Sequence, residues 1–213
     1  MNREADAIVL FGDVVGSRRA PAAASAWLRN LCRQLETLYS SGRLAPFAFT
    51  QGDELQGLLQ PSADPLRAVL FASLHEDSRP MRWVAVHGQV ASGEGPATER
   101  GGEAFVEARA ALEQVKRQRD SMLLRTGDPA TDELLAELAP VLAELLGALT
   151  KRQRTVARLA IVEGLRQAEV AERLNVSRAT ISVTWARGGV RSIERLASAV
   201  RTLFAAGVRA AAA

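Results

Sequence analysis

The chain has 213 residues, 47% of them hydrophobic and 24% charged, which is enough apolar material for one large domain or two small ones. No apolar run approaches the ~20 residues that a membrane span requires, and an acidic residue and a strand pattern occupy the place of a signal peptide's apolar segment. Cys32 is the only cysteine, which excludes a disulfide framework. We therefore expect a cytoplasmic protein with no membrane contact.

The net charge of +3 is unevenly divided along the chain. Residues 150–213 contain 12 basic and 4 acidic side chains, a balance of +8, whereas the preceding residues carry −5. Such an asymmetry is typical of a protein in which one part meets a polyanion and the other does not. The C-terminal part is therefore the better candidate for contact with nucleic acid.

The N-terminal part shows a regular alternation of predicted strands and helices. Residues 7–11 form a continuous apolar run, which predicts a buried strand. Further along, the periodicity predicts a helix at 25–39, a hairpin at 47–59 with its turn at Gly52-Asp53, a helix at 65–75, a strand at 83–91, and either a long helix or a helix and a strand over 102–124. This order is that of a ferredoxin-like antiparallel sheet with helices, an α+β fold.

The stretch "RTGDPATDE" separates this part from an all-helical remainder, because Gly127 and Pro129 break any helix. Residues 131–149 carry a helical apolar stripe that is wide enough to bury against another surface, such as a second copy of the chain. The sequence thus predicts three parts: an α+β domain at 1–126, a linker or dimerisation helix at 127–149, and an all-α helix-turn-helix domain at 150–213.

The stretch "RQAEVAERLNVSRATISVTWARGGVRSI" meets the requirements of a helix-turn-helix. Two short helices at a fixed angle need a small residue at their contact, supplied by Ala171, and a turn residue that tolerates a positive φ, supplied by Asn175. Ser177 can cap the second helix. The pair Thr184-Trp185 departs from the pattern, because an aliphatic residue would usually help to close the core there. The remaining core positions are apolar: Val170, Leu174, Val176 and Ile181.

Together with a preceding helix at 151–163, this segment resembles region four of sigma factors and the related LuxR-type regulators. The resemblance implies binding to double-stranded DNA, with Arg178 as the best candidate for a bidentate contact with guanine. The residues expected to face the major groove are Ser177, Arg178, Ala179, Ser182 and Val183, with Arg187 near the backbone. Phosphate contacts are expected from Lys151, Arg152, Arg154, Arg166 and Arg191. The alternative is a small helical bundle that mediates protein contacts.

Two apolar runs end on an aspartate beside a glycine, in "IVLFGDVVGS" and "TQGDELQGLL". They resemble the first strand and the central hairpin of class III nucleotide cyclases, whose fold GGDEF-type diguanylate cyclases share. The resemblance implies that Asp13 and Asp53 are metal ligands, for Mg²⁺ with a nucleotide. It also implies that three residues lie on the phosphate side of the ligand site: Gly12, Val14 and Gly16. The alternative is a pair of turn-forming aspartates at strand ends.

Other parts of the cyclase pattern are missing. The base-reading lysine is replaced by Phe49, and the asparagine and arginine that stabilise the transition state are replaced by Val106 and Ala110. We therefore expect no enzymatic turnover. Glu54 and Glu103, which could assist a metal, are expected to be solvated surface residues.

The whole pattern most closely resembles the SatD family. It favours a transcription regulator whose degenerate cyclase-like N-terminal domain forms a homodimer, senses a nucleotide-type ligand, or does both. Two other functions are left open. One is a divergent metal-dependent nucleotidyl cyclase or other nucleotide-processing enzyme, and the other is a protein that binds RNA polymerase through its sigma-like segment.

Overall fold

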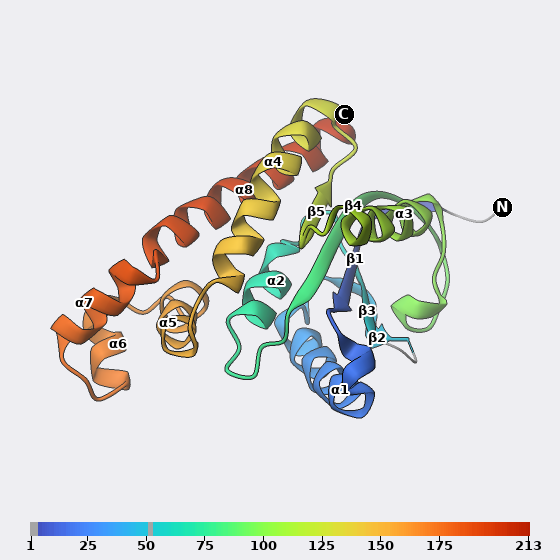
Figure 1. Cartoon of the computed structure of the whole chain (residues 1–213). Coiled ribbons are helices and arrows are strands. Elements are labelled where there is room, and N and C mark those ends of the chain that lie inside the picture. Colours follow the sequence, from blue (N-terminus) through green and yellow to red (C-terminus); the bar gives the residue numbers. More distant parts are fainter. Residues whose placement is uncertain (1–3, 51–52) are drawn as a thin grey trace.

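The computed structural model describes residues 4–50 and 53–213, so Gly52 of the predicted hairpin turn lies outside the described residues. Five strands form one sheet in the order β2-β3-β1-β4-β5 (Figure 1). Their bounds are β1 Glu4–Val14, β2 Arg43–Phe49, β3 Glu54–Leu59, β4 Met81–Ala91 and β5 Met122–Arg125. All neighbours are antiparallel except β4 and β5. The order β2-β3-β1-β4 confirms the predicted ferredoxin-like sheet, and β5 extends it by one parallel strand.

Helices cover both faces of the sheet. α1 (Pro21–Leu38) and α2 (Leu66–Ser73) lie on one face, and α3 (Glu103–Gln118) lies on the other. Because side chains alternate along a strand, Ile8 and Leu10 of β1 join the first core, whereas Val9 and Phe11 join the second. The ambiguous segment at 102–124 is a helix followed by a strand, α3 and β5.

The C-terminal part is entirely helical. α4 (Pro129–Gly147) begins after Asp128, whose side chain accepts a hydrogen bond from the Thr131 backbone N–H at 2.9 Å. The chain continues through α5 (Lys151–Ala157), a π-helical segment (Arg158–Val162), α6 (Gln167–Arg173), α7 (Arg178–Arg187) and α8 (Val190–Ala211). α8 returns along α4 in the opposite direction (Figure 1). None of the helices in the described ranges has the length and apolarity needed to cross a membrane.

One hydrophobic core joins the sheet to the long C-terminal helices. The buried cluster that contains Leu10 of β1 also contains side chains of α4 and α8: Leu135, Leu142, Val200 and Phe204. Gly207 allows α8 to approach the end of β5, because a Cβ at this position would lie 2.8 Å from Thr126 Cβ. The predicted boundaries at residues 126 and 149 therefore fall within a continuous core.

Cys32 reports on the integrity of this core. Its side chain is buried on α1, and burial together with the charge of Glu36 raises the pKa of the thiol to about 12. Because the thiolate is the reactive form, we expect an aromatic disulfide reagent to label the native protein very slowly at neutral pH and the urea-unfolded protein rapidly. Labelling of the native protein as fast as that of the unfolded chain would contradict this placement.

Candidate functional site

The helix-turn-helix is assembled from α6 and α7. Asn175 in the turn has a φ of 50°, which is the left-handed conformation expected of it. The Ser177 hydroxyl accepts a hydrogen bond from the Thr180 backbone N–H at 3.1 Å and caps α7. The predicted core also forms, with Leu174 and Val176 packed against three buried side chains: Val170, Ala171 and Ile181. The sequence prediction is confirmed at these positions.

Two further features shape the surroundings of this unit. Thr150 and Gln153 form a capping box that starts α5, in which Gln153 Oε1 accepts a hydrogen bond from the Thr150 backbone N–H at 2.9 Å. Trp185 packs against both the helix-turn-helix cluster and the main core. Its large ring therefore fills the joint between α7 and the main core, which explains the departure from an aliphatic residue at this position.

The outward face of α7 and its cap carry the five residues predicted to face the major groove and Arg187, which is predicted to lie near the DNA backbone. All six are exposed: Ser177, Arg178, Ala179, Ser182, Val183 and Arg187. A groove of about 550 Å³ runs between this face and α5, and Arg152 lines the α5 side of it. The structure thus brings Arg152 together with Ala179, Val183 and Arg187.

Four polar side chains also line this groove, and the sequence prediction missed them: Thr150, Gln153, Thr180 and Thr184. Thr180 and Thr184 are separated by one helical turn, and Thr184 Oγ1 donates to the Thr180 carbonyl at 2.8 Å. Their four-residue spacing is the signal that assigns both to one face of α7. Their hydroxyl groups add hydrogen-bonding capacity on the α7 side of the groove, where Ala179 and Val183 are apolar.

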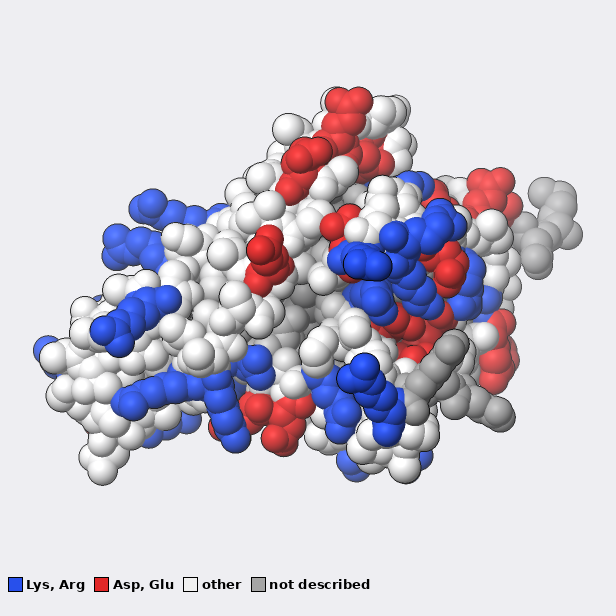
Figure 2. Space-filling view, viewed as in Figure 1, with Lys and Arg blue, Asp and Glu red and all other residues white. Residues whose placement is uncertain are grey.

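Basic side chains stand out over the C-terminal helices, at the left of Figure 2. Lys151, Arg166 and Arg191 are exposed, as phosphate contacts require. Arg154 differs, because its Nη2 donates to the Leu149 carbonyl at 3.3 Å and its side chain lines a pocket beside Trp83 of the sheet. The structure does not bring Arg154 to the groove.

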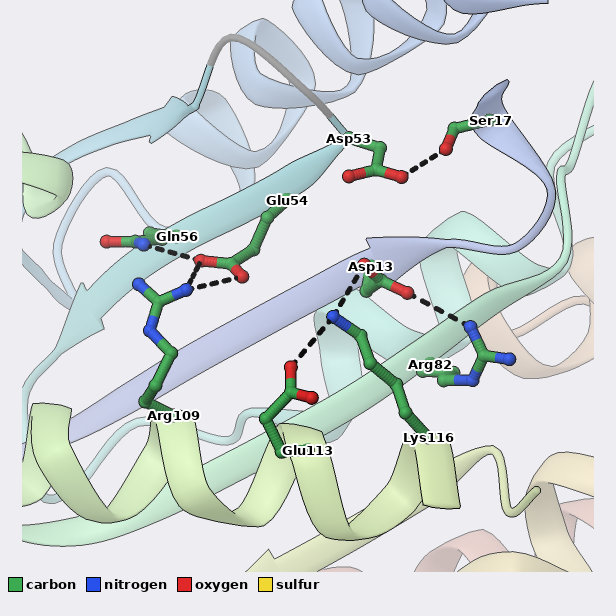
Figure 3. A network of polar contacts seen from close by, with 9 residues as sticks. All are labelled: Asp13, Ser17, Asp53, Glu54, Gln56, Arg82, Arg109, Glu113 and Lys116. Carbon is green, nitrogen blue, oxygen red and sulfur yellow. Dashed lines mark hydrogen bonds and ion pairs between the residues drawn. The ribbon is translucent and has the colours of Figure 1, made fainter. Parts of the chain in front are cut away.

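A layer of charged side chains lies between the sheet and α3 (Figure 3). Asp13 of β1 is in register with Glu54 of β3 on one side and with Arg82 of β4 on the other. Three side chains of α3 point toward these strand residues, and their spacing of four and three residues places them on one helical face: Arg109, Glu113 and Lys116. The three strand residues and the three helix residues together form the charged layer.

Each carboxylate in the charged layer is paired with a cation. Asp13 Oδ2 lies 3.1 Å from Arg82 Nη1, and Asp13 Oδ1 lies 3.4 Å from Lys116 Nζ. Glu54 accepts hydrogen bonds from Arg109 Nη1 at 2.7 and 2.9 Å. Partial burial lowers the pKa of Lys116, but Asp13 and Glu113 outweigh it, so this pKa lies above its usual value. The lysine therefore stays charged at neutral pH.

Glu54 is buried, and the expectation that it is a solvated residue is wrong. The physical reason is that α3 covers Glu54 and supplies Arg109 as its partner. Gln56 Nε2, on the same strand, donates a further hydrogen bond to Glu54 Oε1 at 2.7 Å. Glu103, at the start of α3, is exposed as expected.

Asp53 lies apart from the charged layer, just before β3 (Figure 3). Its carboxylate accepts a hydrogen bond from the Ser17 hydroxyl, and its carbonyl accepts one from the Val14 backbone N–H at 3.1 Å. These contacts join the hairpin to the loop that follows β1. Sequence reasoning missed Ser17 as the partner of Asp53.

The residues predicted for the phosphate side have structural roles. Gly12 and Val14 face the side of β1 opposite to Asp13, because side chains alternate along the strand. A Cβ on Gly12 would lie 2.8 Å from the Trp83 ring, so this glycine is required by packing. Gly16 has a φ of 73°, which favours glycine, and precedes the short 3₁₀ turn that leads into α1.

These carboxylates do not fit a divalent metal. Both oxygens of Asp13 face cations, and Asp53 has a hydroxyl partner, so a metal would first have to displace Arg82 or Lys116. Within the described ranges, no three His, Cys, Asp or Glu side chains are grouped as a metal site. The charged layer instead fastens α3 to the sheet.

Replacing Asp13 with asparagine tests this fastening role. We expect the free energy of unfolding to fall by about 1 kcal/mol, because Arg82 and Lys116 lose a charged partner but remain partly exposed to water. Urea denaturation with and without Mg²⁺ measures the effect, and Asp77→Asn, an exposed acid in the loop before β4, is the matched control. Stabilisation by Mg²⁺ that disappears in Asp13→Asn would instead show a metal site.

Part of the C-terminal region matches a known protein family. Residues 132–188 match the family described as Sigma-70, region 4. Among solved structures, the chain is similar to a bacterial light-regulated adenylyl cyclase, with a TM-score of 0.41 and 15% identity, over 57% of this chain and 76% of that chain. It is also similar to a regulator of polyketide synthase expression from Bifidobacterium adolescentis, with a TM-score of 0.31 and 16% identity, over 99% of this chain and 82% of that chain. No curated protein sequence matches the chain.

The matched family covers α5 to α7 together with most of α4. The chain therefore consists of a mixed α/β sheet followed by a helix-turn-helix of the sigma-70 region 4 type. Neither structural likeness assigns a role to a residue of this chain, and the resemblance to the SatD family stays a prediction.

Proposed function

We propose that the protein is a cytoplasmic transcription regulator in which α7 reads base edges in the major groove of DNA. The observation that carries this proposal is the outward face of α7, where Arg178 is exposed to solvent and Arg187 lines a groove together with Arg152. Arg178 follows the Ser177 cap, and the N-terminal residues of a recognition helix are the ones that meet bases. The sigma-70 region 4 match and the +8 balance of residues 150–213 also support it.

In this proposal the sheet is a scaffold and not an enzyme. Val106, at the position of the cyclase asparagine, is an apolar side chain that is 72% exposed. Asp13 and Glu54 are neutralised by Arg82, Lys116 and Arg109. Neither a hydrogen-bond donor for a transition state nor a free carboxylate pair for a metal is supplied by these residues. Binding of a nucleotide-type ligand stays a prediction, and it would have to proceed without Mg²⁺ at Asp13.

One preparation of the full-length protein tests both halves of this proposal. Duplexes selected by the protein from a random pool should converge on a common sequence. The same preparation should form no cyclic nucleotide from any nucleoside triphosphate with Mg²⁺ or Mn²⁺. A cyclic product that is lost in Asp13→Ala would favour the alternative function, a divergent cyclase. Failure to enrich any duplex, combined with binding to RNA polymerase, would favour the protein-contact alternative.

The proposed regulator forms a homodimer through the outer face of α4. An apolar stripe spaced by four, three and four residues lies on this face: Leu134, Leu138, Val141 and Leu145. Leu134 and Val141 are 53% and 47% exposed, which is unusual for side chains of this size. Acidic side chains gather over α4 (Figure 2), where Glu133, Glu137 and Glu144 are exposed, whereas α8 exposes Arg195 and Arg209. A two-fold arrangement that sets α4 of one copy beside α8 of its partner would match these charges.

Replacing Val141 with glutamate tests the dimer. We expect the variant to sediment as a monomer at concentrations where the wild-type chain is dimeric, because a charge would have to be buried in the apolar stripe. Ala136→Glu, at an exposed position of α4 outside the stripe, should leave the dimer intact. Monomeric wild-type protein, or equal effects of the two changes, would contradict the proposed seam.

A further inference from the structure

The sheet and the helices α1 to α3 that cover it are called the sheet half below. A pocket of about 400 Å³ lies where this half meets the C-terminal helices. We call it the junction pocket. Its apolar wall is supplied by α1, α2 and the π-helical segment: Leu38, Leu70, Ile161 and Val162. Leu38 and Ile161 are partly buried and Val162 is exposed, so the wall is open to water. The volume of the pocket falls within the range of sites that bind small molecules.

The rim of the junction pocket carries more positive than negative charge. Arg201 of α8 forms an ion pair with Asp64, which lies in the loop before α2. Arg67 of α2 is exposed and forms no ion pair with any carboxylate in the described part of the chain. Its guanidinium carbon lies 5.7 Å from the centroid of the Tyr39 ring. The rim therefore presents two guanidinium groups and one carboxylate.

Hydrogen bonds fix the carboxylate of the rim. Asp64 Oδ1 accepts from the Leu66 backbone N–H at 3.0 Å, and the Asp64 carbonyl accepts from the Tyr39 hydroxyl at 2.6 Å. Burial, together with the charge of Asp64, raises the pKa of Tyr39, so its hydroxyl remains a donor at neutral pH. Asp64 is thus held by two elements of the sheet half, and Arg201 is held against it.

We infer that the junction pocket binds a small organic monoanion with an apolar body, such as an aliphatic carboxylate. Its head binds to the unpaired Arg67 and, in competition with Asp64, to Arg201, because guanidinium groups form strong charge-assisted hydrogen bonds with carboxylates. Its body lies over the apolar wall, which removes exposed carbon surface from water. A cation is disfavoured, because the one carboxylate of the rim is paired with Arg201.

The site also suggests how such a ligand would act, in a step that rests on the proposed function. The π-helical segment that supplies Ile161 and Val162 ends shortly before α6, the first helix of the helix-turn-helix. π-helical turns are frequently found at functional sites. A bound anion competes with Asp64 for Arg201 and contacts both halves of the protein. The anion therefore changes the affinity for DNA by as much as it binds more tightly to one relative arrangement of the two halves than to another.

Octanoate is the probe that tests the site. Calorimetric titration of the full-length protein should give saturable binding with one site per chain. In a methyl NMR spectrum, the signals of Leu70 and Ile161 should shift with the same midpoint. Octyltrimethylammonium, which has the same tail and the opposite charge, should not bind saturably. Absence of saturable octanoate binding, or shifts confined to other methyl groups, would overturn the inference whether or not the protein binds DNA.

A pair of arginine variants distinguishes octanoate binding in the junction pocket from nonspecific attraction of an anion to a basic protein. Arg67→Ala should weaken octanoate binding by about tenfold or more, since one charge-assisted contact is lost. Arg29→Ala, an exposed arginine on α1 that does not line the pocket, should bind octanoate like the wild type. Both changes place alanine on a helix surface, and circular dichroism checks that the variants fold. Equal affinities of the two variants would overturn the assignment.

Discussion

The Arg178→Ala variant is expected to bind its specific duplex about 1–3 kcal/mol more weakly than the wild type and to become indifferent to one base pair. Arg178 is exposed at the N-terminal end of α7 and forms no ion pair with a described residue, so its guanidinium group is available to a base. Competition binding with duplexes that vary one base pair at a time measures both effects. The loss should be much smaller on random DNA.

Two further variants separate base reading from charge. Arg152→Ala, at the α5 edge of the groove, should weaken binding to all duplexes alike and reduce the dependence on salt. Arg117→Ala, at the end of α3, removes the same charge from the sheet domain, outside both the groove and the proposed dimer seam, and should have little effect. If Arg178→Ala lowers affinity equally for specific and random duplexes, its assignment as the base reader is wrong.

The Gly207→Ala variant is expected to lower the free energy of unfolding by about 1–3 kcal/mol, although alanine favours a helix. The added Cβ would lie 2.8 Å from Thr126 Cβ and 2.8 Å from Thr131 Cγ2, and Thr126 is fully buried. α8 would have to move away from the sheet and from α4. The midpoint of urea denaturation, with the m-value held fixed, measures the loss.

Gly147→Ala is the matched control, because it adds the same methyl group at the end of α4. A Cβ there would meet nothing within 4 Å. This variant should be neutral or more stable by up to about 1 kcal/mol. Equal midpoints for the two variants would contradict the close packing of α8 on the sheet half.

The helix-turn-helix could be predicted from the sequence because its requirements are local. Three residues that lie close together in the chain meet these requirements. Ala171 allows the two helices to make contact, Asn175 forms the turn, and Ser177 caps the second helix. The antiparallel strands could be predicted for the same reason, since alternation along a strand depends only on its own two faces. The ferredoxin-like order then followed from the succession of elements.

The missed features depend on residues that are distant in the sequence. Glu54 was expected to be solvated because its partner, Arg109, is 55 positions away. Arg154 was assigned to phosphate contacts, but the meeting of α4, α5 and the sheet gives it other neighbours. The spacing of the apolar residues along α8 indicates a helix. The chain order does not reveal that this helix returns to the sheet, where five of these residues are buried in the main core: Val190, Ile193, Ala197, Val200 and Phe204.

DNA binding by the C-terminal helices can be measured as the affinity of the full-length chain for a labelled duplex over a range of salt concentrations. We expect the logarithm of the association constant to fall linearly with the logarithm of salt concentration, by about 0.9 for each phosphate neutralised. Arg152→Ala should give a shallower slope. Absence of binding at low ionic strength, or an affinity that does not change with salt, would show that these helices are not a DNA-binding unit.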